Sequence, residues 1–453
     1  MSKVKDMTVG NPMKLILSFA FPLIITNLGQ QLYMIVDSAI VGRVVGVKAL
    51  AAVGATDWSY WLVLWTIQAL TQGFATYVAH YFGKKDFNGL NKVIAMSVEL
   101  CAFFGILITV VGVSAVRPLL TLLQTPSDIF NGAVTYLTTM IVGTLIVMAY
   151  NMAAAILRAF GDGKTPLVAM CVAAILNILL DLLFVLNFGL GVFGAALATL
   201  ISQLVSFIYC LFEIRKFEYV QLSHRHFTPD FSMIFTLCRF GLPLALQHMV
   251  IGASGMALQS SINLQGSVFL AGYTANNKIF GLLESSSLSL GFASTTFTAQ
   301  NYGAGKTKRM KEGVKATVKT AIILAFVISV LIMLFGNFLL RAFIDPNETN
   351  ADTALEIGTR FLTIVSYLLP VLYLLNVFRA IIQGFGNSIC SMLSGILESI
   401  VRVLLAKWVF SLVGSEILYY TEPMSWVSSA VFIIISYFVV KKKYYTVCRK
   451  SSA

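Results

Sequence analysis

Long apolar segments follow one another along almost the whole chain, with short charged or glycine- and proline-containing breaks between them. Hydrophobic residues make up 58% of the 453 residues and charged residues 11%, whereas an ordinary soluble domain carries about 25% charged residues. The mean hydropathy is +0.83. A chain this apolar would collapse in water, and it needs a bilayer as its solvent. The pattern predicts an integral membrane protein and excludes a soluble globular, disordered or nucleic-acid-binding chain.

Twelve of these segments are long enough to cross a bilayer, for which about 20 apolar residues suffice. We therefore expect an all-α membrane protein with twelve transmembrane helices. The expected spans are 15–41, 51–79, 93–115, 130–157, 166–187, 191–213, 233–262, 269–299, 316–340, 355–382, 389–413 and 424–440.

The basic residues predict the orientation of these helices, because cytoplasmic loops carry an excess of Lys and Arg. If the N-terminus is cytoplasmic, 24 of the 32 basic residues, Arg379 among them, fall in inward-facing segments. Five fall outside, and Lys278, Arg402 and Lys407 lie within spans. Both termini are therefore expected in the cytoplasm. Because topology accounts for the net charge of +12, we expect no nucleic-acid partner.

Short motifs recur in the same order in the two halves of the sequence. Pro22 matches Pro243 and Asn151 matches Asn376, with nearly the same separation in both pairs. Five such matches in register indicate a duplicated six-helix unit. The other three are Leu50-Ala51 with Leu270-Ala271, Tyr81-Phe82-Gly83 with Asn301-Tyr302-Gly303, and Phe160-Gly161-Asp162 with Phe385-Gly386-Asn387.

The duplication predicts the domain organisation. Because six is an even number, both halves enter the membrane from the same side, so we expect two parallel six-helix bundles related by a pseudo-twofold axis along the membrane normal. This is a recurrent design of secondary transporters. The expected parts are an N-terminal lobe at 1–214, a cytoplasmic linker at 215–232, a C-terminal lobe at 233–440 and a basic cytoplasmic tail at 441–453.

Acidic residues within the membrane are costly and usually functional, and the candidates in the first half are Asp37 in span 1 and Asp181 in span 5. Asn177 precedes Asp181 by one helical turn and shares its face. Thr199 in span 6 and Tyr136 in span 4 reach a similar depth. Two carboxylates, an amide and a hydroxyl at one depth predict a site for Na+, with Asp37, Asn177, Asp181 and Thr199 as ligands, or for a proton.

A purely structural role for these acids is the alternative, and the repeat argues against it. The second-half positions that match Asp37, Asn177 and Asp181 hold Leu258, Arg402 and Ala406. The duplicated scaffold therefore does not require acidic residues at these positions.

On these residues the chain resembles the multidrug and toxic compound extrusion (MATE) family, in particular its prokaryotic members. Pro22 is followed by Asp37 after fifteen residues, and Asn177-x-x-x-Asp181 by Thr199 after eighteen. The resemblance implies a cation site formed by these residues, with Tyr136 and Asn151 of span 4 nearby. It also implies export of organic cations or amphiphiles across the cell (inner) membrane in exchange for Na+ or H+. The span 7 Glu and span 10 Asp of some members are lacking here.

The second half has intramembrane charges of its own. Glu398 and Arg402 stand four residues apart in span 11 and are expected to pair. We expect the substrate cavity to draw on polar side chains of spans 7, 8 and 11, namely Glu284, Gln259, His248, Lys278 and Arg402.

The expected mechanism begins with cation binding at Asp37 and Asp181. Span 1 then bends at Pro22, a conformational switch, because proline removes a backbone hydrogen bond, and substrate is expelled. The alternative function is that of the related branch, the flippases for lipid-linked precursors. Such a flippase would need several arginines in its cavity. An enzyme is not expected, because the sequence has no nucleophile and base set and no metal motif such as H-E-x-x-H. No nucleotide site is expected either: Gly305-Lys306-Thr307 imitates a phosphate-binding loop, but Gln300 stands where such a loop needs glycine. We expect a monomer whose partners are small cationic or amphiphilic molecules and the bilayer, with no cofactor besides the coupling ion.

Overall fold

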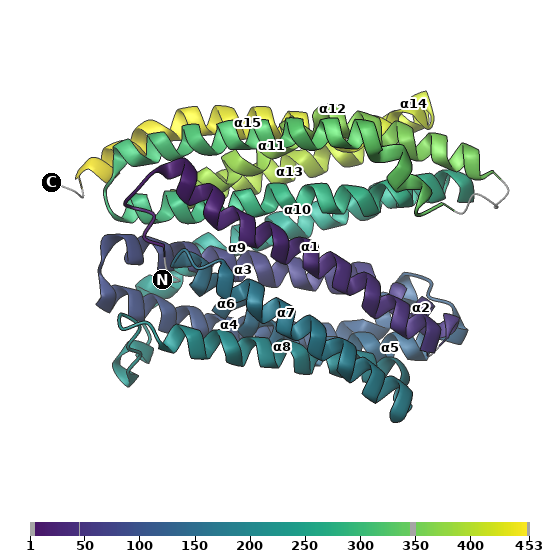
Figure 1. Cartoon of the computed structure of the whole chain (residues 1–453), viewed down its shortest axis with the longest axis horizontal. Coiled ribbons are helices and arrows are strands. Elements are labelled where there is room, and N and C mark those ends of the chain that lie inside the picture. Colours follow the sequence, from purple (N-terminus) through teal and green to yellow (C-terminus); the bar gives the residue numbers. More distant parts are fainter. Residues whose placement is uncertain (1–4, 45, 345–349, 451–453) are drawn as a thin grey trace. The chain divides into compact units, whose positions relative to one another are not determined.

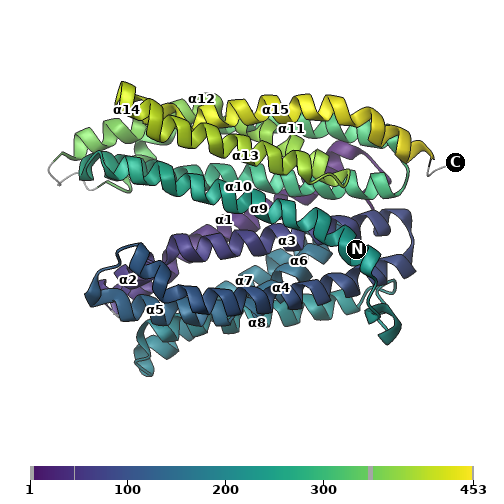
Figure 2. The same cartoon turned by 180° about the vertical axis from the view of Figure 1, so that it is seen from behind.

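A computed structural model describes residues 5–44, 46–344 and 350–450; the side chains at 32–44, 47, 447, 449 and 450 are outside this description. Every regular element of the described chain is helical, and in each half the long helices run side by side (Figures 1 and 2). The first half comprises α1 (Pro12–Val44), α2 (Val47–Gly54), α3 (Asp57–Lys84), α4 (Phe87–Leu122), α5 (Ser127–Val142), α6 (Thr144–Ala159), α7 (Lys164–Asp181), η1 (Leu182–Asn187) and α8 (Gly191–Arg215).

The second half follows the short 3-10 helix η2 (His224–Phe227). It comprises α9 (Phe231–Asn263), α10 (Ser267–Gly303), α11 (Thr307–Arg341), α12 (Ala351–Gly384), α13 (Ile389–Val403), η3 (Leu404–Val409), α14 (Phe410–Val413) and α15 (Glu416–Lys450).

Nine helical segments of the described chain are long and apolar enough to cross a membrane, and α5 and α6, bent by 47° at Gly143, form a tenth together. The helices α3 and α10, expected as spans 2 and 8, do not belong to this group. The helix α10 buries a file of hydroxyl side chains that includes Ser287, Ser289 and Thr296. A helix enclosed by protein needs no lipid-compatible surface, so a criterion based on hydropathy does not recognise it as a membrane span. The chain is thus an all-helical, multi-pass membrane protein.

Large apolar side chains are exposed along α4 and α11. Phe103, Ile106 and Val110 of α4 are more than half exposed, as are Phe326 and Phe338 of α11. Monomeric soluble proteins rarely expose contiguous apolar surface of this kind. These two helices therefore present faces suited to lipid.

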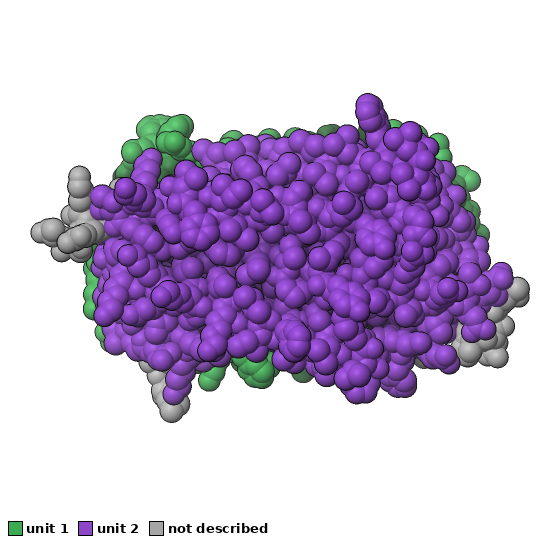
Figure 3. All heavy atoms as spheres, turned by 90° about the horizontal axis from the view of Figure 1, so that it is seen from above, with its two compact units in different colours: residues 1–6, 21–245 green, residues 7–20, 246–453 purple. Residues whose placement is uncertain are grey.

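The chain divides into two compact units, coloured separately in Figure 3. Unit 1 comprises Met1–Asp6 and Phe21–Ala245, and unit 2 comprises Met7–Ala20 and Leu246–Ala453. The start of α1 therefore belongs to unit 2 and the start of α9 to unit 1, an exchange that the expected lobes do not include. Both changes of unit fall close to the repeated prolines, Pro22 in α1 and Pro243 in α9.

A lysine holds the segment before each of these two helices. In unit 2, Lys306 Nζ donates to the carbonyl and the hydroxyl of Thr8, at 2.9 and 3.0 Å. In unit 1, Lys92 Nζ donates to the carbonyl of Thr228 and, at 3.0 Å, to its hydroxyl. The two threonines are repeat counterparts, because they are as far apart in sequence as the matched glycines 83 and 303. The side chain of Lys306, in the Gly-Lys-Thr turn, thus binds Thr8.

Equivalent hydrogen bonds fix the register between the two halves. The hydroxyl of Ser206 in α8 donates to the carbonyl of Ala169 in α7 at 2.9 Å. In the second half, the hydroxyl of Ser429 in α15 donates to the carbonyl of Ser394 in α13 at 2.7 Å. Ala169 is therefore the counterpart of Ser394, and Ser206 is the counterpart of Ser429.

A second pair of contacts gives the register of the preceding helices. Thr109 of α4 donates to the carbonyl of Ile141 in α5 at 3.3 Å, and Ser329 of α11 donates to the carbonyl of Ser366 in α12 at 2.7 Å. Thr109 is therefore the counterpart of Ser329, and Ile141 is the counterpart of Ser366. The duplication is thus visible in contacts as well as in motifs.

Candidate functional site

The hairpin of α7, η1 and α8 brings together three residues predicted from the sequence. Glycines at 189 and 191, with φ of 64° and 56°, form its turn. The amide Nδ2 of Asn177 donates to the hydroxyl of Thr199 at 3.3 Å, and that hydroxyl donates to the carbonyl of Ala195 at 3.1 Å. Asp181, one turn after Asn177, is fully buried, as is Asn177. The structure thus places an amide, a hydroxyl and a carboxylate in one hairpin of unit 1.

The helix α7 ends at Asp181, and the chain continues as the six-residue π-helix η1. Such turns are rare and are frequent at functional sites. A buried carboxylate is costly unless a cation, a proton or hydrogen bonds compensate its charge. Asp181 is thus a fully buried carboxylate of unit 1, whose charge must be compensated in one of these ways.

The remaining residues of the predicted site differ in what the structure describes. Tyr136 is buried in α5, at 9% exposure. Asn151 in α6 uses its amide locally, donating to the carbonyl of Val147 at 2.9 Å. The side chain of Asp37, on α1, lies outside the described residues.

Pro22 is buried in α1, and its carbonyl accepts a hydrogen bond from the hydroxyl of Thr26 at 2.9 Å. The ring removes one backbone donor from the interior of the helix. This is the part of α1 at which the chain changes from unit 2 to unit 1.

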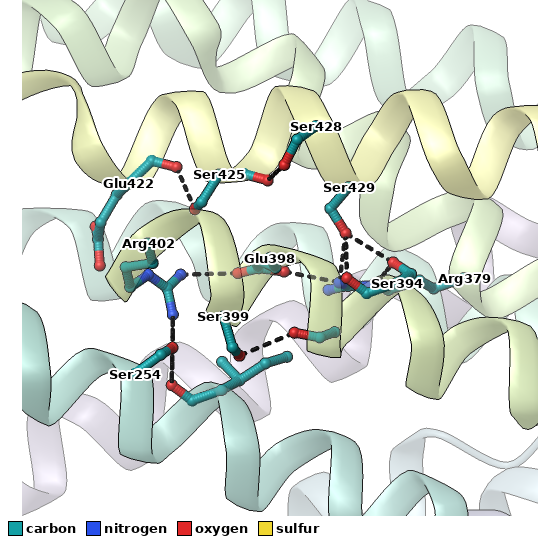
Figure 4. Close-up of polar contacts among 12 residues, drawn as sticks. Ser254, Arg379, Ser394, Glu398, Ser399, Arg402, Glu422, Ser425, Ser428 and Ser429 are labelled. Carbon is teal, nitrogen blue, oxygen red and sulfur yellow. Dashed lines mark hydrogen bonds and ion pairs between the residues drawn. The ribbon is translucent and has the colours of Figure 1, made fainter. Parts of the chain in front are cut away.

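Unit 2 contains a buried ion-pair network (Figure 4). Glu398 of α13 accepts a hydrogen bond from Arg402 at 2.7 Å through one oxygen, and one from Arg379 of α12 at 2.7 Å through the other. The exposure of these three residues is 7% or less. Arg402 also donates to the hydroxyl of Ser254 in α9 at 2.8 Å, and Arg379 to that of Ser394 at 2.8 Å. The expected pair of Glu398 and Arg402 is confirmed.

Two members of this region were missed by the sequence interpretation. Arg379 was expected in an inward-facing loop, but it lies within α12 and is buried against Glu398. Glu422 precedes the last expected span, 424–440, and was not singled out from the sequence. The helix α15 instead begins at Glu416 and continues through Pro423, so Glu422 is helical. A charge paired inside a bundle and a charge in a loop look alike in sequence.

The residues expected to form a substrate cavity have different environments. Glu284 of α10 is half-buried and interacts electrostatically with Glu398 and both arginines. His248 of α9 is half-buried, and Lys278 of α10 is exposed. Gln259 donates to the side chain of Asn263 on its own helix at 2.8 Å. Arg402 is committed to Glu398 and Ser254.

A family model decides the identity of the fold. The MatE family model matches residues 22–183 and 243–408, once in each half of the chain. The chain belongs to the MATE family. MATE proteins are transporters, so the chain is not an enzyme.

Relatives of this MATE protein cover almost its full length. It is 30% identical over 407 residues, 90% of the chain and 88% of the relative, to "Probable multidrug resistance protein YpnP" of Bacillus subtilis. It is 25% identical, over 84% of the chain and 82% of the relative, to "Probable multidrug resistance protein NorM" of Thermotoga maritima. A solved outward-facing multidrug resistance MATE family transporter shares the fold with a TM-score of 0.88, at 23% identity and 98% coverage of both chains.

Proposed function

We propose that this MATE protein is a secondary active efflux antiporter that exports organic cations or amphiphilic drugs in exchange for Na+ or H+ bound in the first repeat. The observation that best supports this proposal is that Asp181 is buried one helical turn after Asn177, whose side chain is hydrogen-bonded to Thr199. In a low dielectric a buried carboxylate favours neutralisation, by a proton or by a cation held with neighbouring oxygens. The names of the curated relatives, which refer to multidrug resistance, support drug-like substrates.

The repeat supports Asp37 as a second member of the site. Its counterpart Leu258 packs in one hydrophobic cluster with Ala406, the counterpart of Asp181. Phe361, which matches Tyr136 when α5 and α12 are aligned on Ile141 and Ser366, belongs to the same cluster. If the repeats share their packing, Asp37, Tyr136 and Asp181 converge in the first half.

The proposal includes a topology of twelve transmembrane helices in two parallel six-helix bundles. The two polar helices α3 and α10 are the eleventh and twelfth spans. Both termini are cytoplasmic, which is supported by the 24 of 32 basic residues that then fall in inward-facing segments. The protein then resides in the cell (inner) membrane as a monomer, with lobes at 1–214 and 233–440, a linker at 215–232 and a tail at 441–453.

Transport follows from neutralisation of the acids. A cation entering from outside binds Asp37 and Asp181, α1 bends near Pro22, and substrate leaves the cavity. Bending there costs little, since Pro22 already lacks one helical hydrogen bond. Glu284, His248, Gln259 and Lys278 are the candidate cavity residues, whereas Arg402 is occupied by its ion pair.

Export of a fluorescent organic cation from proteoliposomes tests this function. Liposomes prepared with an opposing Na+ gradient, a pH gradient or neither separate the two coupling ions. We expect accumulation against the substrate gradient under one imposed ion gradient, and none without a gradient. Equal transport under all three conditions would contradict antiport and favour a passive pathway.

A further inference from the structure

The second repeat contains a small pocket at the position of the predicted cation site of the first. Thr199 stands as far before Ser206 as Glu422 stands before Ser429, so these two residues are counterparts. Tyr136 matches Phe361 in the same way, and Asp37 matches Leu258. Glu422, Phe361 and Leu258 line one cavity in unit 2. The duplicated scaffold therefore keeps a hollow at this place in the second half, with different chemistry.

The cavity is the size of a single water molecule. Its volume is about 10 Å³, near the lower limit for holding one water. The polar residues that line it include Glu422 of α15 and Asn276 and Tyr273 of α10. A pocket of this size accommodates a proton or a single small ion.

Asn276 provides an independent indication of a ligand. Its side chain is 2% exposed, and its Oδ1 has no hydrogen-bond donor among the described residues. A buried acceptor left without a partner costs about 1–3 kcal/mol. The carboxylate of Glu422 is also an acceptor when ionised. A proton on Glu422 turns one of these two acceptors into a donor that satisfies Asn276 directly or through one water.

The charges of unit 2 also favour a bound proton. Glu284 interacts with two further acids, Glu398 and Glu422, and with two guanidinium groups, those of Arg379 and Arg402. Three acids against two arginines leave one surplus negative charge in a low-dielectric region, where uncompensated charge is costly. One proton makes the set neutral.

Arg402 and Glu398 of α13 and Tyr273 and Glu284 of α10 interact electrostatically with Glu422, and Tyr419 of α15 lines the same pocket. Of the other charged or titratable groups, Arg379 and Arg360 lie on α12 and His248 on α9. Arg360 is paired with Glu416, and Lys407 of η3 contacts the hydroxyl of Ser260. Lys311 of α11 lies over the ring of Tyr445, at the far end of α15. The helix α14 carries no ionisable side chain.

We propose that Glu422 is a second protonation site, in which one proton is held in the pocket with Asn276 and shared electrostatically with Glu284. The carboxylate of Glu422 and the unpartnered acceptor of Asn276 can share one proton, which is the ligand we propose. The site goes beyond the antiport proposed above, which places its coupling ion in the first repeat. Either proposal can fail without the other.

Proton uptake by the purified protein in detergent tests this site without any transport assay. The protein is moved from alkaline to mildly acidic pH in weak buffer, and bound protons per molecule are counted with an indicator dye. We expect Glu422→Gln to take up about one proton fewer than the wild type, and Glu416→Gln, in the same helix but exposed, to match the wild type. Infrared difference spectra should show a protonated carboxyl band that Glu422→Gln removes.

Further variants and outcomes decide between the possible roles of the pocket. Asn276→Leu removes the acceptor and should shift the uptake to lower pH while keeping the proton count. Equal uptake and an unchanged carboxyl band in a folded Glu422→Gln variant would overturn the proposal. Release of the proton by added Na+ in the wild type, lost in Glu422→Gln, would also overturn it and make the pocket a Na+ site. Asp181→Asn, in the same assay, reports on the first repeat separately.

Discussion

The side-chain amide of Asn177 donates a hydrogen bond to the hydroxyl of Thr199, 3.3 Å away across the hairpin of α7 and α8. The equivalent positions in unit 2 hold Arg402 and Glu422, which interact as charges. One scaffold position thus carries a neutral polar contact beside an acid in one repeat and an ionic contact in the other. The two halves keep equivalent hydrogen bonds between these helices and have diverged in the chemistry of this position.

Removing the hydroxyl should weaken ion coupling. Thr199→Val deletes the acceptor of Asn177, and a hydrogen bond contributes about 1 kcal/mol. We expect the ion concentration for half-maximal export to rise about fivefold, with little change in the maximal rate. The control is Thr66→Val, whose hydroxyl donates to the carbonyl of Leu62 in its own helix. An unchanged ion dependence in Thr199→Val would argue against a role for this contact.

Neutralising the centre of the ion-pair network should destabilise unit 2. Glu398→Gln leaves two buried guanidinium groups without their carboxylate, a loss of about 3–5 kcal/mol. Glu416→Gln removes the exposed partner of Arg360, for which about 0–1 kcal/mol is expected. Thermal unfolding in detergent, followed by tryptophan fluorescence, should show a large decrease in melting temperature for Glu398→Gln and almost none for Glu416→Gln. Similar melting temperatures would contradict this account of the network.

A close backbone approach between α10 and α12 depends on Gly272. A Cβ atom there would lie 2.5 Å from the carbonyl oxygen of Ala354 and 2.9 Å from the amide nitrogen of Gly358. Because neither backbone atom can move alone, Gly272→Ala should cost about 1–3 kcal/mol. Gly291→Ala, on the same helix, would meet Ala380 at an ordinary 3.7 Å and should be neutral or slightly stabilising. The melting temperatures of the two variants check this difference.

The segment before α1 should loosen when its lysine is replaced. Lys306→Met removes two charge-assisted hydrogen bonds to Thr8, and the amide of Met7 donates to Gln300 at 2.9 Å in the same segment. Hydrogen exchange over residues 7–10 should accelerate by about tenfold or more. Lys308→Met, at an exposed site on α11, serves as the control. Protection equal to that of the wild type would show that the lysine does not hold the segment.

The meeting of Asn177 and Thr199 could be predicted because helical rise and the distance from a turn fix the depth of a residue. The pairing of Glu398 with Arg402 followed from helical spacing alone. Arg379 and Glu422 could not be found in this way, because their partners are distant in sequence and their charges resemble loop residues.

The exchange of the first segments of α1 and α9 between the units has no local sequence signal. It depends on contacts such as that of Thr8 with Lys306, which lies in the other half of the sequence. Hydropathy likewise underrates α10, whose buried serines and threonines face protein. Patterns along one helix predict what that helix contains, whereas its packing partners are set by the tertiary structure.

The most direct test of the central claim is gradient-driven export by Asp181→Asn and Asp37→Asn in proteoliposomes. A matched control is Asp128→Asn, an acid in unit 1 whose side chain is 54% exposed beside Lys48. We predict that both intramembrane variants lose at least about tenfold in ion-driven export, because an amide cannot bind the coupling charge, while Asp128→Asn exports like the wild type. Export at the wild-type rate by a folded Asp181→Asn protein under the same ion gradient would contradict the account.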